Sequence, residues 1–152
     1  MHDVPSTPTQ RRALAGVIAS FLSLGAVACD KKVSECNKLV AVTQKHNPQL
    51  SGAMDRLSTI QSNPKVLDEF SAVVKAASED IAALSLSDET VAGFAKDYLG
   101  LLEAADAFGK TLGDAARTND VEALNLATAE GEKVAQTEAA IVESVNGYCQ
   151  GG

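Results

Sequence analysis

Three cysteines are the residues of this 152-residue sequence whose types and spacing most clearly point to chemistry. Cys29 follows a run of small residues, while Cys36 and Cys149 lie near the two ends of the remaining chain. The sequence has no Cys-x-x-Cys spacing, which is typical of redox-active pairs and of covalent haem attachment. We therefore expect these thiols to serve as modification or cross-linking sites and not as redox catalysts.

The histidines and carboxylates do not form a recognisable catalytic or metal-binding pattern. His46 is the only histidine after residue 28, and beside Pro48 we expect it to be an exposed residue at a helix end. A b-type haem held by His46 and Met54 is disfavoured, because both residues lie on one helical segment. The sequence lacks Glu-x-x-His pairs, His-Glu-x-x-His, Gly-x-Ser-x-Gly and glycine-rich phosphate loops. It therefore predicts no cofactor, no metal site and no enzymatic activity.

Residues 1–28 have the organisation of an export signal. A polar start ends in Arg11 and Arg12, and an uncharged, mostly apolar stretch covers residues 13–28. A helix of this stretch would reach only about 24 Å, short of the ~30 Å hydrocarbon core of a bilayer. We therefore expect a cleaved signal peptide that uses the general secretion route, because paired arginines alone are a weak sign of twin-arginine export.

Ala26, Val27 and Ala28 directly precede Cys29. This segment resembles the lipobox of bacterial lipoproteins, although Ala26 stands where leucine is usual. The resemblance implies that residues 1–28 are removed, that Cys29 carries lipid, and that the mature chain, 29–152, is anchored on the extracytoplasmic side of the cell envelope. The alternative is ordinary secretion, because the same small residues satisfy the general cleavage rule. Lipidation leaves two cysteines to pair in an oxidising compartment, whereas ordinary secretion leaves one thiol over.

From residue 33 onward, apolar residues recur at alternating steps of three and four, which predicts amphipathic helices. Four such segments follow one another, and neither a period-two alternation nor a hairpin motif indicates a strand. Pro48 predicts a kink or a short break near Asn47. The expected core stripes are, in chain order, Val33, Cys36, Val40, Thr43, Asn47, Leu50, Met54 and Leu57; Leu67, Phe70, Val74, Ala77, Ile81 and Leu84; Val91, Phe94, Tyr98, Leu101, Ala105, Phe108, Leu112 and Ala115; and Leu124, Ala127, Gly131, Val134, Ile141, Val145 and Tyr148.

Short connections make neighbouring helices antiparallel, so the sequence predicts an all-α, up-down-up-down four-helix bundle. In that arrangement the start of the first helix and the end of the fourth share one end of the bundle. Cys36 and Cys149 should then form a disulfide, which the chain-entropy account values at about 4.7 kcal/mol for so long a loop. The loops at 61–64 and 118–120 would point away from the anchored end and form the expected contact surface.

The sequence also contains short motifs that predict helix caps and helix packing. Ser87 is the expected cap of the third helix, and Asn119 with Glu122 resembles a capping box at the start of the fourth. Gly109 and Gly113 have the spacing of a close-packing motif, which we attribute to coincidence because polar residues flank it.

Thr43, Asn47 and Glu138 occupy places in otherwise apolar stripes. The simpler interpretation is that the helices separate there and these side chains reach water. The alternative interpretation is that the three residues line a small pocket or a partner-binding groove.

Charge and composition narrow the choice of partners. The net charge is −7, and this acidity argues against nucleic acid or anionic lipid as an electrostatic partner. We expect a non-enzymatic binding or scaffolding module, whose partners are the membrane, through the lipid on Cys29, and another envelope protein. The alternative is a small-molecule sensor or carrier that uses a cavity between helices.

Overall fold

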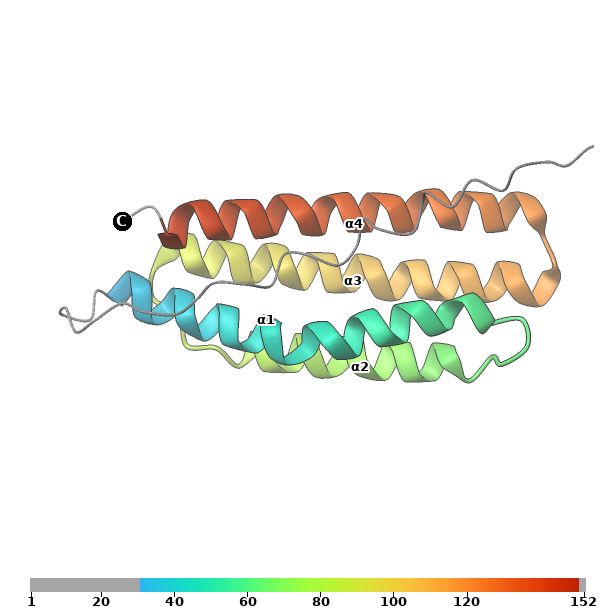
Figure 1. Ribbon diagram of the computed structural model, residues 1–152, viewed down its shortest axis with the longest axis horizontal. Coiled ribbons are helices and arrows are strands. Elements are labelled where there is room, and N and C mark those ends of the chain that lie inside the picture. Colours follow the sequence, from blue (N-terminus) through green and yellow to red (C-terminus); the bar gives the residue numbers. More distant parts are fainter. Residues whose placement is uncertain (1–30, 151–152) are drawn as a thin grey trace, which may run out of the picture.

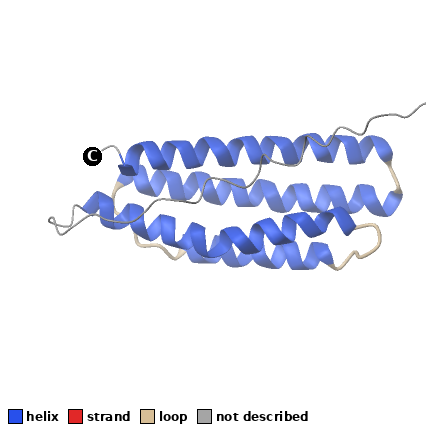
Figure 2. Cartoon of the chain, in the orientation of Figure 1, coloured by secondary structure: helices blue, strands red, loops and turns tan. Residues whose placement is uncertain are grey.

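The computed structural model describes residues 31–150, which form four helices joined by short connections (Figure 1, Figure 2). The helices are α1 (Lys31–Arg56), α2 (Val66–Ala82), α3 (Glu89–Thr118) and α4 (Val121–Gln150), and a 3-10 turn, η1 (Leu57–Thr59), follows α1. Residues 31–150 contain no strand, so the predicted all-α class is confirmed. The proposed signal peptide, 1–28, and Cys29 lie outside the described residues.

Successive helices run antiparallel and lie side by side, which confirms the up-down-up-down order (Figure 1). The pairs α1–α2, α2–α3 and α3–α4 pack extensively. By contrast, α1 and α4 contact each other much less, and the disulfide described below joins them. The fourth side of the bundle is therefore its least tightly packed seam.

Asp88 caps the start of α3. Its Oδ1 accepts hydrogen bonds from the backbone N–H groups of Thr90 and Val91, both at 3.0 Å. The prediction that Ser87 is the cap is wrong by one residue, because the Ser87 hydroxyl is engaged by Glu35.

The connection between α3 and α4 also differs from its sequence prediction. Asn119 takes the left-handed conformation, with φ 52°, and ends α3. Asparagine is one of the few residues that adopt this conformation readily. Asp120 then supplies the first-turn hydrogen bond of α4, because its Oδ1 accepts from the Ala123 N–H at 3.0 Å.

The core stripes of α2 and α3 follow the predicted spacing. In α2, the side chains of Phe70, Val74, Ala77 and Ile81 are buried. Most of the α3 stripe is buried too, while Phe94 and Leu112 are partly buried against the core. Alternating steps of three and four place these residues on one face of each helix, and burial of that face stabilises the bundle.

The register of α1 is only half as predicted. Cys36 and Leu57 are buried as expected, but Val33 is exposed, and three later positions of the stripe are displaced by one residue. The buried residues at those positions are Leu39, His46 and Ala53, in place of Val40, Asn47 and Met54.

Of the two outcomes predicted near Asn47, a kink or a short break, the break does not occur, because α1 continues through Pro48. Proline removes one backbone hydrogen bond, and Figure 1 shows the axis of α1 bending near its middle. The one-residue shift in the buried face is already present at Leu39, before Pro48, so it does not begin at the bend.

Gly109 and Gly113 lie where large side chains of α2 pack directly against the backbone of α3. A Cβ on Gly109 would lie 2.9 Å from the Phe70 ring, and one on Gly113 would overlap the side chain of Leu67. The prediction that this spacing is coincidence is therefore wrong. The two glycines give the large side chains of α2 the space that they occupy.

Candidate functional site

A disulfide joins the start of α1 to the end of α4. The Sγ atoms of Cys36 and Cys149 are 2.06 Å apart, and the two Cα atoms are 5.9 Å apart. Cys36 is buried and Cys149 is partly buried. The predicted pairing is confirmed, and it follows from the antiparallel order that brings these two helix ends together.

Next to Cys36, a buried carboxylate holds the connection between α2 and α3. Glu35 accepts hydrogen bonds from the Ser87 hydroxyl at 2.6 Å and from the backbone N–H groups of Ser87 and Asp88 at 2.8 and 2.7 Å. The Ser87 hydroxyl, followed by the Asp88 N–H, lowers the pKa of Glu35 to about 2. The ionised side chain therefore clamps α1 to the start of α3.

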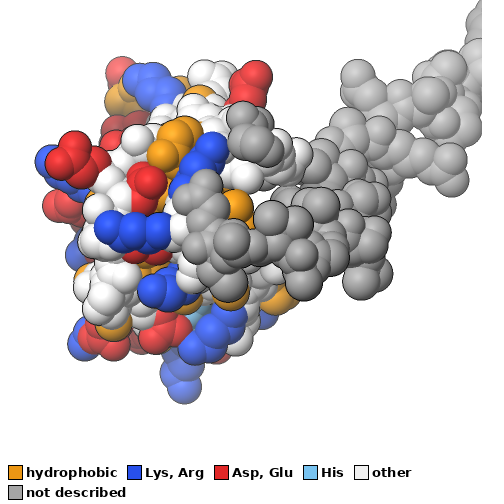
Figure 3. Space-filling view, turned by 90° about the vertical axis from the view of Figure 1, so that its left-hand side faces the viewer, with side chains coloured by type: hydrophobic (Ala, Val, Ile, Leu, Met, Phe, Trp, Pro, Cys, Tyr) orange, Lys and Arg blue, Asp and Glu red, His pale blue; other side chains and the backbone are white. Residues whose placement is uncertain are grey.

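Tyr148 extends this cluster to α4. Its hydroxyl donates to the Asp88 carboxylate at 3.1 Å, and its ring packs edge-on against Phe94 with centroids 5.8 Å apart. The Lys32 Nζ lies 4.5 Å from the centroid of the Tyr148 ring, in a cation–π contact. In Figure 3, which views this end, acidic and basic side chains are interspersed over the surface that is not drawn grey.

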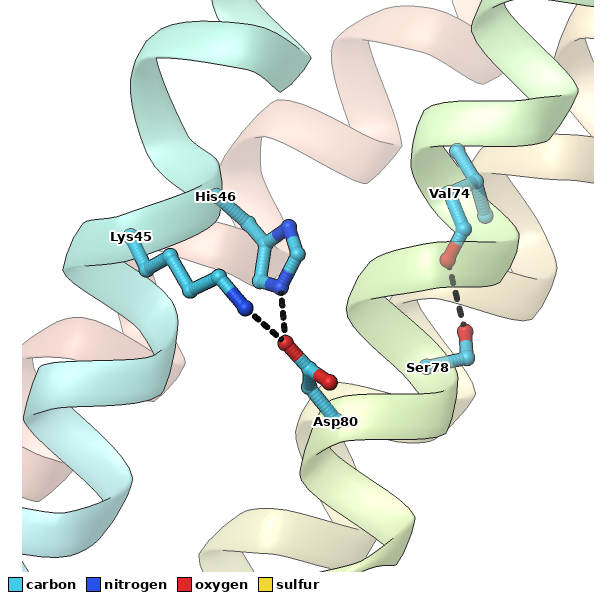
Figure 4. A network of polar contacts seen from close by, with 5 residues as sticks. All are labelled: Lys45, His46, Val74, Ser78 and Asp80. Atoms are coloured by element: carbon cyan, nitrogen blue, oxygen red, sulfur yellow. Dashed lines mark hydrogen bonds and ion pairs between the residues drawn. The ribbon is translucent and has the colours of Figure 1, made fainter.

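A second polar cluster crosses from α1 to α2 in the middle of the bundle. Figure 4 shows His46 and Lys45 reaching toward Asp80. His46 Nε2 lies 2.8 Å from Asp80 Oδ2, and Lys45 Nζ lies 2.6 Å from the same oxygen. Lys45 first, and then His46, hold the pKa of Asp80 below its usual value.

His46 is only 4% exposed, so the prediction of an exposed residue at a helix end is wrong. An ionised carboxylate can only accept, so Nε2 carries the proton in the bond to Asp80. The other ring nitrogen, Nδ1, is buried and has no hydrogen-bond partner among the described residues. A general base must reach the proton that it removes, and neither nitrogen of this ring is free and accessible. The arrangement joins two helices and does not present a reactive group.

Two of the three polar residues singled out in the sequence converge on Tyr98. The Tyr98 hydroxyl donates to Asn47 Oδ1 at 3.3 Å. Burial, together with the negative charge of Glu138, raises the pKa of Tyr98 to about 12. Thr43 does not join them, because its hydroxyl donates to the Val40 carbonyl at 3.0 Å. Asn47 and Glu138 are exposed and Thr43 is partly buried.

Two open grooves lie elsewhere on the described part of the chain. The first, the loop-end groove, holds about 350 Å³ and is lined by Met54, Leu57, Ser58, Ile60, Gln61, Phe108, Leu112 and Leu124. The second, the side groove, holds about 770 Å³ and lies between residues 96–111 of α3 and 130–141 of α4. Neither groove is lined by Thr43, Asn47 or Glu138.

Residues 31–150 hold no group of three or more His, Cys, Asp or Glu side chains that could bind a metal ion. None of their helices combines the length and the apolar character needed to cross a bilayer.

Several features of these sites could not be predicted from the sequence, although weak signals exist. The burial of His46 is signalled by the seven-residue spacing of Leu39, His46 and Ala53, once the register is known. Glu35 carries a fainter signal, as an acidic residue next to a cysteine expected in the core. Its partners, Ser87 and Asp88, lie far along the chain, and only the fold brings them near.

No protein-family model, curated protein or solved structure matches this chain. Its function has to be inferred from the chemistry and the placement of the described residues.

Proposed function

We propose that this chain is a lipid-anchored, extracytoplasmic helical module that binds another envelope protein without catalysing a reaction. The observation that carries the proposal is the position of the loop-end groove. The groove lies at the opposite end of the bundle from Lys31, where the described chain begins.

The distance between these two ends suits a module that presents a surface away from a membrane. α1 has 26 residues, and at 1.5 Å per residue it is about 39 Å long. If Cys29 carries lipid, the disulfide end lies next to the bilayer and the loop-end groove faces outward. This orientation agrees with the contact surface expected from the sequence.

The lining of the loop-end groove suits apolar side chains of a protein partner. Six of its eight residues are apolar, and only Ser58 and Gln61 are polar. Met54 is 36% exposed, and Leu126 and Val121, near the start of α4, are 61% and 69% exposed. We infer that the occupant is an amphipathic helix, which would place apolar residues from successive turns in such a groove.

The sensor or carrier hypothesis has less support. Small-molecule sites bury most of the ligand surface in a cleft or cavity with a few convergent polar groups. Both grooves are open, and the polar residues that converge, Asn47 and Glu138 at Tyr98, line neither of them.

Site-specific photo-crosslinking in cells that make the full chain tests the proposal. A photo-reactive residue at Gln61 should give a light-dependent adduct with one defined envelope protein, while the same residue at Lys75, on the exposed side of α2, should not. Met54→Asp should abolish the Gln61 adduct. Val33→Asp, which alters an exposed apolar residue at the other end of α1, should leave it intact. Equal adducts from Gln61 and Lys75, or an adduct that survives Met54→Asp, would contradict the proposal.

A further inference from the structure

The side groove is built by α3 and α4 alone. Its floor consists of Leu101, Phe108, Val134 and Ile141, which are buried or partly buried. Small, exposed residues of α3 form one wall, namely Gly100, Ala104 and Ala107. The base of the groove is therefore apolar. The small side chains on its α3 side would allow another helix to pack close to α3.

Gly100, like Gly93 and Gly147, has no packing partner within the described chain, and of these three glycines only Gly100 lines the side groove. A Cβ at this position would meet nothing within 4 Å, and no glycine of the described chain has a positive φ. Glycine inside a helix is destabilising relative to alanine. In Gly109 and Gly113 this cost is offset by close packing against α2, whereas the space above Gly100 is open to a second molecule.

The two ends of the side groove carry matching sets of charges. Phe108 of α3 lies beside Gly131 of α4, and the two helices are antiparallel. Glu130 and Lys133 therefore lie near the level of Phe108, at one end of the groove, whereas Lys96 and Asp97 lie toward the other end. Within residues 31–150, none of these four side chains takes part in an ion pair or a side-chain hydrogen bond. Each end therefore offers one free cation and one free anion.

We propose that a second copy of this chain docks along the side groove in an antiparallel, two-fold arrangement. A two-fold axis perpendicular to the helices places the Lys96–Asp97 end of one copy against the Glu130–Lys133 end of the other. Each contact then occurs twice, once for each copy. Lys96 then faces Glu130 of the second copy, and Asp97 faces its Lys133. The axis passes near Gly100 and Ala104, where small residues allow the two α3 helices to approach closely.

An unrelated partner would need to match both charge pairs by its own sequence, whereas a second copy matches them by symmetry. This self-association is independent of the loop-end groove, which lies on other residues apart from the shared Phe108. Failure of one proposal therefore leaves the other standing.

The test is sedimentation equilibrium of the full chain in detergent, with the disulfide intact, over a wide range of concentrations. The wild-type chain should form dimers. Reversing one end, Lys96→Glu with Asp97→Lys, should weaken association about tenfold or more, and so should Glu130→Lys with Lys133→Glu. Combining the two reversals should restore association, since each opposed pair then regains opposite charges.

Gly100→Leu tests the close approach. It should weaken the dimer while the melting temperature of the dilute monomer does not fall, because the space at Gly100 is open. Ala76→Leu, at an exposed position of α2, is the matched control and should leave association unchanged. A wild-type chain that stays monomeric at every concentration overturns the proposal. So does a dimer that is unaffected by either charge reversal or by Gly100→Leu.

Discussion

His46 Nε2 lies 2.8 Å from Asp80 Oδ2, and this bond joins the middle of α1 to α2 at a place where the imidazole is almost fully buried. The same ring has a second buried nitrogen, Nδ1, without a partner among the described residues. Replacing Asp80 and replacing His46 should therefore change the free energy of unfolding by different amounts.

Removing Asp80 should cost more than removing His46. Asp80→Ala leaves both buried ring nitrogens without partners, and an unpaired buried polar group costs about 1–3 kcal/mol. His46→Leu removes both nitrogens and keeps an apolar side chain in the core, so we expect a change close to zero. Adding Asp80→Ala to His46→Leu should then cost little more. Urea denaturation of the four proteins measures this coupling, and strictly additive losses would contradict it.

The carboxylate of Glu35 should make stability depend on acid. Its folded pKa of about 2 lies below its ordinary value of 4.5, so its stabilising effect is complete above pH 4.5 and is lost as pH falls toward 2. The lowered pKa values of Asp80 and Asp106 act in the same direction. Glu35→Gln should lower the melting temperature at pH 7 and flatten its dependence on pH between 4.5 and 2. Glu103→Gln, on an exposed carboxylate, is the control and should leave the profile unchanged.

Alanine substitutions at two glycines of α3 should have opposite effects. Gly113→Ala places a methyl group against Leu67, and overpacking of this kind costs about 1–3 kcal/mol. Gly100→Ala meets no atom within 4 Å and should stabilise the monomer by about 1 kcal/mol. Leu67→Ala should reduce the penalty of Gly113→Ala. Thermal unfolding at low protein concentration compares them, and equal effects at both positions would show that the α2–α3 contact is not tight.

The disulfide should be formed in protein isolated from cells and should stabilise it. Mass analysis without reductant should show a deficit of two hydrogens relative to the reduced chain. Replacing both Cys36 and Cys149 with alanine should cost about 2–5 kcal/mol, because the bond closes nearly the whole domain into one loop. Free thiols on both residues in freshly isolated protein would refute the pairing.

The lipid anchor is tested by Cys29→Ser. Loss of the thiol should abolish labelling by a fatty-acid probe and move the protein out of the membrane fraction. The cell fraction containing the Cys36→Ser variant should not change, since that cysteine lies inside the bundle. If Cys29→Ser leaves partitioning unchanged, the apolar stretch at 13–28 holds the chain at the membrane, and not a lipid.

The fold itself was largely predictable from the sequence. Alternating steps of three and four in α2 and α3 identify their buried faces, because a helix repeats every 3.6 residues and a core needs one apolar side. Short connections impose antiparallel neighbours, and this order alone brings Cys36 to Cys149. These features depend on local spacing and connectivity, both of which are visible along the chain.

Only the tertiary structure decided which residues meet across helices. The burial of His46 depends on the register of α1 and on the facing Asp80, which lies 34 positions later. The partners of Glu35 lie more than 50 positions away, and Gly109 and Gly113 gain their purpose from Phe70 and Leu67 on another helix. In α1, either of two adjacent residues could face inward at several positions, so two registers have similar apolar content. The neighbouring helices select one register, because their side chains offer packing and hydrogen-bond partners to that face alone.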